Sequence, residues 1–313
     1  SSMSNNPRRV PVAHGDSFML PLPPGHRFPM AKYAEIPRRL LGSGLIQPEQ
    51  IFRNGPMKKE RVLRVHTQDY VERLLSQHLT RHEVRKIGFP LSATLVKREL
   101  ILAEATWQCA QKALQVGMSF NTAGGTHHAF ADHGEGFCLL NDVAIAAANL
   151  RHEGLARRIL IIDLDVHQGN GTAHIFADTP EVFTFSMHGQ KNYPVQKQIS
   201  DCDIALPPET DDDAYLQHLQ TALPEIIARF APDFAFYIAG VDVLASDKLG
   251  KLQLTLEGCQ ARDQFVYETL AHHHLPVVTV MGGGYSPALN TVVSAHINTF
   301  VAGLGVFSQA KQA

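Results

Sequence analysis

Three residues that could bind a metal or move protons follow one short apolar run. The run is residues 159–162, Ile-Leu-Ile-Ile, and Asp163, Asp165 and His167 come after it at a spacing of two. In an extended chain alternate side chains point the same way, so these three would share one face. Buried carboxylates need a counter-charge, which a metal ion can supply. The spacing predicts a metal site, and helix capping by one aspartate, with His167 bonded locally, is the simpler alternative.

Further candidates follow other apolar runs or glycines. Asp242 comes shortly after the apolar residues 234–239, much as Asp165 comes shortly after its own run. Tyr285 follows three glycines. His127 and His128 follow a glycine pair, where a loop could turn both imidazoles into one pocket or leave them in solvent.

Together these side chains carry the parts of a metal-assisted amide hydrolysis. Two carboxylates and one imidazole can hold zinc with positions left open, and such a metal acidifies water and polarises a carbonyl. A histidine pair can supply the general base and acid, a further aspartate can orient one histidine, and a phenol can donate to an oxyanion. The zinc ligands would be Asp165, His167 and Asp242, and the histidine pair is His127 and His128. The orienting aspartate would be Asp163, and the phenol belongs to Tyr285.

Strand-like and helix-like segments alternate along the chain and place these candidates after strand ends, where ligands bind in open α/β sheets. We expect residues 1–9 to be disordered, with the first two serines a tag remnant, and residues 10–313 to form one doubly wound α/β domain. Residues 10–28 and 79–91 read as loops. Helices are expected at residues 30–42, 62–79, 95–116, 141–149, 211–230 and 289–304, and a loop followed by a helix at residues 254–272.

Composition narrows the function classes. The 313 residues are 44% hydrophobic and carry a formal net charge of −2, so no general basic field supports nucleic-acid binding. Four cysteines without a C-x-x-C pair indicate reduced thiols rather than a disulfide scaffold or a cysteine-rich zinc site. We expect a cytoplasmic protein with no signal peptide and no membrane span. A homo-oligomer stays open.

Five motifs in this order resemble those of the histone deacetylase family over residues 10–304. They are GGTHHAF, GEGFCLLNDVAIA, IIDLDVHQGNGT, AGVDVLASDKLGKL and GGGYSP. The third and fourth look like the class IV branch and its bacterial relatives. The resemblance implies the arginase/deacetylase fold, with a central parallel sheet of about eight strands. It also implies a zinc-dependent hydrolase that removes acetyl and, for class IV, long fatty-acyl groups from lysine side chains of a peptide or protein.

The same resemblance implies a role for each matching residue. His128 would be the main general base and acid, His127 its electrostatic companion paired with Asp163, and Tyr285 the group that polarises the carbonyl. One zinc per chain would be held by Asp165, His167 and Asp242. The walls of the acyl-lysine channel would be Gly136, Phe137 and Tyr193. A structural potassium would be bound by the carbonyls of Asp163, Asp165, His167 and Met187 and the hydroxyl of Ser186.

One position departs from class I members, which have an aspartate where this chain has Asn170. Without that carboxylate the pKa of His128 should be lower, because a nearby negative charge favours the imidazolium. Class IV relatives are similar to this chain here, so Asn170 indicates the branch rather than lost activity.

Three other functions are weighed against this one. A two-manganese ureohydrolase of the same fold would need an aspartate where Gly169 stands and a second one near Asp242. A non-catalytic acyl-lysine binding module would be expected to lose some of the catalytic side chains, and all are present. A small acylated amine, such as an acetylpolyamine, stays open as the substrate.

Overall fold

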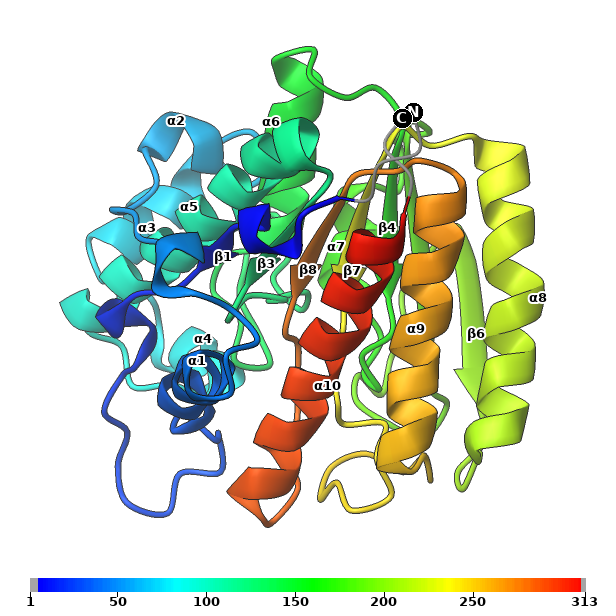
Figure 1. Cartoon of the computed structure of the whole chain (residues 1–313). Helices are drawn as coiled ribbons and strands as arrows, with labels where there is room; N and C mark the ends of the chain where they lie inside the picture. Colours follow the sequence, from blue (N-terminus) through cyan, green and yellow to red (C-terminus); the bar gives the residue numbers. More distant parts are fainter. Residues whose placement is uncertain (1–4, 311–313) are drawn as a thin grey trace.

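One eight-stranded sheet runs through the part of the chain that the computed structural model describes, residues 5–310 (Figure 1). All neighbouring strands pair in parallel, in the order β2-β1-β3-β8-β7-β4-β5-β6. This confirms the expected fold. The strands are β1 (Val12–Ala13), β2 (Ile51–Phe52), β3 (Met118–Asn121), β4 (Ile159–Asp163), β5 (Val182–Gly189), β6 (Cys202–Leu206), β7 (Phe234–Ile238) and β8 (Val277–Val280).

Helices cover both faces of the sheet, with α8, α9 and α10 on one face and α5 and α6 on the other (Figure 1). The side chains of β4 show why. Leu160 and Ile162 belong to the core on the α8–α10 side, whereas Ile159 and Ile161 belong to the core on the α5–α6 side. A strand buried on both faces is apolar throughout, as in parallel sheets.

The bounds of the helices follow local signals. Asn141 caps α6 and Asp211 caps α8 through their side chains, and Gly117 ends α5 in the left-handed conformation. The helices are α1 (Lys32–Gly42), α2 (Lys59–Val62), α3 (Gln68–Leu75), α4 (Arg81–Ile87), α5 (Ala93–Val116), α6 (Asp142–His152), α7 (Asn170–Ile175), α8 (Asp212–Phe230), α9 (Leu256–His272) and α10 (Leu289–Gln309).

Two stretches between residues 62 and 91 differ from the sequence-based expectation. The helix expected over residues 62–79 is broken, because Thr67 is extended and caps a new helix, α3. The loop expected over residues 79–91 contains α4, which begins with a capping box between Thr80 and Glu83. Its polar composition reflects an exposed helix rather than a loop.

The disorder expected for residues 1–9 is not found in residues 5–9, the described part of that stretch. Residues 1–4 lie outside the described residues, but Pro7–Arg9 form a short 3-10 helix capped by the side chain of Asn6. The side-chain amide of Asn5 also donates to the carbonyl of Phe307 in α10, over 3.4 Å. A proline at the first helical position and a contact with the last helix order this segment.

Helix α10 is long and apolar enough to cross a membrane by length and composition alone, whereas the sequence predicted no run long enough to do so. Of its most apolar window, 56% is buried within the protein, and the helix packs on α9 and α1. A core helix of a folded domain has the same composition, and its packing accounts for the apolar sequence.

Candidate metal centre and active site

Asp165, His167 and Asp242 come together at the carboxyl ends of two adjacent strands. Asp165 and His167 follow β4, Asp242 follows β7, and these strands pair side by side. All three side chains are buried, and one ligand atom from each lies within 4.8 Å of the others. The backbone amide of Val166 donates to Asp242 Oδ1 over 2.9 Å, which ties the two strand ends together.

The chemistry of this set fits a metal ion. Asp242 Oδ2 is buried and accepts no hydrogen bond from the described residues, and His167 Nδ1 lies 3.2 Å from it. A buried carboxylate oxygen without a hydrogen bond is costly in the interior. Gly283 lies so close that an added Cβ would sit 2.3 Å from this oxygen. Burial lowers the pKa of His167, but the carboxylates of Asp165 and Asp242 outweigh it and raise that pKa to about 10. The site therefore attracts positive charge.

His127 forms a buried pair with a carboxylate. Its Nδ1 lies 2.5 Å from Asp163 Oδ2, and its Nε2 lies 3.7 Å from Asp165 Oδ1. Burial lowers the pKa of His127, yet Asp163 and then Asp165 raise it to about 9. The structure thus makes the contact that the sequence analysis expected between Asp163 and the first histidine.

His128 faces an amide, and the orientation of that amide follows from its neighbours. Asn170 Nδ2 donates to the Glu135 carboxylate over 3.1 Å, and Asn170 Oδ1 accepts from the Gly171 amide. Oδ1 therefore faces His128 Nδ1, at 2.7 Å, and this nitrogen carries the proton. Nε2 is left unprotonated. The pKa of His128 lies well below its usual range, because of burial and then the nearby His127 and His167.

Tyr285 presents a protonated phenol to the same space. Burial raises its pKa well above the ordinary value, and its ring centroid lies 6.3 Å from that of His167. Its backbone amide donates to Asp247 Oδ1 over 2.6 Å, which fixes the loop. Among the described residues the phenol has no hydrogen-bond partner, so it is available to a substrate.

The three expected channel residues lie beside the histidines. Gly136 has φ +56°, and a Cβ there would come within 2.9 Å of the His128 ring, so only glycine fits. The ring of Tyr193 meets His128 edge-on at 5.0 Å, and the Phe137 ring lies 6.5 Å from that of Tyr285. Two connected spaces result.

An inner cavity of about 50 Å³ is bordered by both histidines, Asp165, His167 and Tyr285. An outer pocket of about 350 Å³ leads to His128 and His167 between Phe137 and Tyr193. The predicted catalytic residues therefore surround a single narrow site.

Three buried residues support the site and were missed by the sequence analysis. Glu135 accepts hydrogen bonds from both Asn170 and Tyr193, and Asp247 accepts from three backbone amides, including that of Tyr285. Lys32, in α1, donates to the Gly282 carbonyl over 3.0 Å, and burial lowers its pKa to about 8. A buried lysine in an amphipathic helix, such as Lys32, leaves no signal in the sequence. Glu135 does leave one, because an acidic residue stands there between two glycines of the GEGF motif.

The groups expected around potassium lie on neighbouring strands. Asp163 in β4 pairs with Ser186 in β5, and Met187 follows, fully buried. The Ser186 hydroxyl contacts His188 Nδ1 at 2.9 Å. The strand register therefore places Asp163 beside Ser186 and Met187, all three of which are expected to bind potassium.

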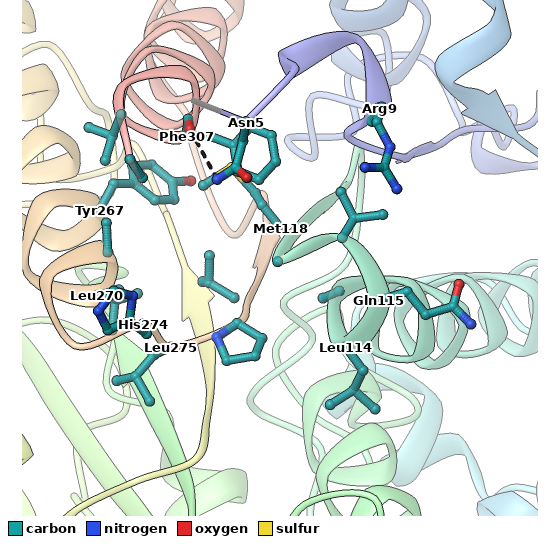
Figure 2. Close-up of a pocket in the computed structure, with 18 residues that line it drawn as sticks. Asn5, Arg9, Leu114, Gln115, Met118, Tyr267, Leu270, His274, Leu275 and Phe307 are labelled. Carbon is teal, nitrogen blue, oxygen red and sulfur yellow. Dashed lines mark hydrogen bonds between the residues drawn. The ribbon is translucent and has the colours of Figure 1, made fainter. Parts of the chain in front are cut away.

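A separate cavity of about 390 Å³ opens at the opposite side of the sheet from the site, at the amino ends of β3 and β8 (Figure 2). Its polar side chains, Arg9, Gln115 and His274, stand apart around it, and Asn5 is bonded to Phe307 (Figure 2). None of the predicted site residues lines it in the described part of the chain. Among the described residues, the candidate catalytic side chains converge at the carboxyl ends of the strands.

Comparison with known proteins agrees with this geometry. Residues 26–300 match the family described as histone deacetylase domain. An uncharacterized protein of Picosynechococcus sp. is 46% identical over 91% of this chain and 95% of that protein. Histone deacetylase 2 of Arabidopsis thaliana is 28% identical over 87% of this chain and 73% of that protein. The crystal structure of an HDAC homologue from Aquifex aeolicus matches with a TM-score of 0.80 and 25% identity, covering 95% of this chain and 84% of that one.

Proposed function

This chain belongs to the histone deacetylase family, and on that premise we propose that it is a zinc-dependent hydrolase of acyl-lysine side chains. The observation that carries the proposal is a buried Asp-His-Asp set, of which Asp165 and His167 line one small cavity together with two histidines and a phenol. The direct test is release of acetate from an acetyl-lysine peptide by the zinc-loaded protein, with loss of activity on chelation.

Each side chain has a definite task in this proposal. Zinc held by the Asp-His-Asp set would polarise the amide carbonyl and acidify a water molecule. His128 Nε2 accepts a proton from the attacking water and returns it to the departing lysine amine, so that the C–N bond breaks into a carboxylate and an amine. His127, held by Asp163, contributes positive charge, and the Tyr285 hydroxyl donates to the developing oxyanion.

Two finer points are proposed from the resemblance. One zinc per chain is expected, because the described residues contain one group of three suitable ligands and no second group. That count does not favour the two-manganese ureohydrolase. A structural potassium is proposed beneath β4, held by the carbonyl and hydroxyl groups named above. Class IV identity rests on Asn170 and on the Ser-Asp-Lys-Leu-Gly sequence after Asp242.

Replacing Asn170 by aspartate should move the acidic limb of the kcat/KM profile to higher pH. A carboxylate 2.7 Å from His128 Nδ1 stabilises the imidazolium, raises the pKa of His128 and so protonates the base at a higher pH. The new carboxylate would also face Glu135. Asn170→Asp combined with Glu135→Gln restores a donor between those two positions and should show the cleaner shift.

The profile is measured on one acetyl-lysine peptide, with zinc content checked at each pH. The Glu135→Gln single variant serves as the control. An acidic limb that stays at the same pH in both variants carrying Asn170→Asp would contradict the assignment of His128 as the working base.

The acyl chain is expected to be short. The inner cavity of about 50 Å³ has room for roughly four water-sized groups, which suits acetyl better than a long chain. This observation favours acetyl over the fatty-acyl groups that the class IV resemblance implies. Forcing extra methylenes into a packed space typically costs about 1–3 kcal/mol.

We therefore expect kcat/KM to fall at least about tenfold from acetyl to octanoyl lysine on one peptide, and further for myristoyl. Leu102 lines the cavity, so Leu102→Ala should narrow the difference between acetyl and octanoyl. A wild-type preference for octanoyl or myristoyl lysine would contradict the short-chain proposal and support a fatty-acyl hydrolase.

A further inference from the structure

Basic side chains surround the outer pocket through which a substrate would reach the candidate active site. The pocket has a volume of about 350 Å³ and ends on His128, His167 and Tyr285. All of its charged lining residues other than these site histidines are cationic and exposed. They are Arg27, Arg85, Lys86, Lys191 and Lys251.

Three of these cations belong to the wall that carries Phe137. The guanidinium carbon of Arg27 lies 5.4 Å from the centroid of the Phe137 ring. Arg85 and Lys86 lie in the last turn of α4, and the Lys86 carbonyl accepts a hydrogen bond of 3.1 Å from the Gly136 amide. This bond fixes the end of α4 beside the channel.

The other two cations belong to the wall that carries Tyr193. Lys191 precedes Tyr193 in the turn after β5. The side-chain amide of Asn192 donates to the Leu249 carbonyl over 2.7 Å. This bond joins the turn to the loop that carries Lys251, so the two lysines stand on connected segments.

These five cations form the mouth of the outer pocket, and their positive charge is largely uncompensated. No aspartate or glutamate lines the pocket within residues 5–310. Lys86 Nζ lies 3.4 Å from Glu135 Oε1, and in the described chain the other four cations form no ion pair. The whole chain has 28 basic and 30 acidic residues, so its net charge has the opposite sign to that of the mouth.

We propose that the mouth selects acyl-lysine peptides with aspartate or glutamate beside the acylated lysine, an inference that rests on the proposed function. An extended peptide advances about 3.3 Å per residue, so residues on both sides of the inserted lysine would approach the cations of the two walls. Opposite charges speed the encounter, and like charges oppose it. An acetylpolyamine keeps positive amines and would be repelled.

The test compares kcat/KM of the zinc-loaded protein on three peptides of equal length, in which acetyl-lysine is flanked by glutamates, glutamines or lysines, and on acetylputrescine. We expect the acidic peptide to exceed the basic one at least about tenfold at low salt. The ratio should approach one near 1 M salt, where screening acts within about 3 Å.

Equal values at low salt, or a preference for the basic peptide or acetylputrescine, would overturn the inference and leave the proposed deacylase intact. If the protein hydrolysed none of the four substrates, the proposed function would be overturned, and this inference with it.

Charge reversal at the mouth provides the matched variant. Lys191→Glu combined with Lys251→Glu should lower the acidic-to-basic ratio about tenfold or invert it. The neutral pair Lys191→Gln and Lys251→Gln should change the ratio in the same direction by less. Arg157→Glu with Arg229→Glu makes the same charge change at the opposite edge of the sheet and should keep the wild-type ratio. A ratio unchanged in both mouth variants would overturn the inference.

Discussion

Replacing Tyr285 by phenylalanine is expected to lower kcat on acetyl-lysine peptide by on the order of 10²–10³, the usual cost of one oxyanion donor. The change removes one hydroxyl and keeps the ring that packs 6.5 Å from Phe137 and 6.4 Å from Phe28. Since the hydroxyl bonds to no described residue of the protein, Tm and zinc content should stay near the parent values. Steady-state kinetics with metal analysis measures both.

Tyr193 offers a matched control for this experiment. Its hydroxyl also lies at the channel, but it donates to Glu135 rather than pointing at the inner cavity. Tyr193→Phe should therefore reduce kcat much less than Tyr285→Phe does. Similar losses in the two variants would mean that the phenol of Tyr285 has no special place in the transition state.

Replacing Asp242 by asparagine should remove metal and activity together. The amide keeps the size of the side chain and an oxygen for the Val166 amide, but it removes the charge of a buried ligand. Loss of a partner outside the ligand shell typically weakens metal affinity about 10–100-fold, so loss of a ligand charge should exceed that. Zinc titration of the metal-free variant, followed by activity at each step, gives both numbers.

Asp233→Asn is the control at the amino end of the same strand, β7. Asp233 accepts hydrogen bonds from the backbone amides of Arg157 and Arg158, at the edge far from the site. Its replacement should leave zinc affinity at the parent value. An Asp242→Asn protein with full zinc occupancy and normal turnover would show that the metal, if used, binds elsewhere.

The parts of the site that could be predicted from sequence are those with a local pattern. The buried four-residue run before Asp163 predicts the parallel strand, and alternation along an extended segment predicts that Asp163, Asp165 and His167 share a face. The strand ends at Asp163, so Asp165 and His167 are positioned by the bend after it, in which the His167 amide donates to Asp165 Oδ1 over 2.9 Å. Asp242 is about 75 residues away, and it joins them because β7 pairs directly with β4. That adjacency follows from the family resemblance and not from spacing.

Other parts depend on contacts that leave no local signal. β1 and β2 have two residues each, too short for any period, and β6 alternates exposed and partly buried residues at the edge of the sheet. Glu135 and Asp247 act through hydrogen bonds to loops distant in sequence. The size of the inner cavity is set by side chains from several elements, so acyl-chain length could not be predicted from the motifs.

The central claim is that one zinc at the Asp165, His167 and Asp242 site supports deacetylation. The most direct test strips the metal from the protein, adds zinc back in steps and follows acetate release from an acetyl-lysine peptide. We predict no activity without metal and a linear rise that ends at one zinc per chain. Full activity in the metal-free protein, or a plateau that needs two metal ions per chain, would contradict the account.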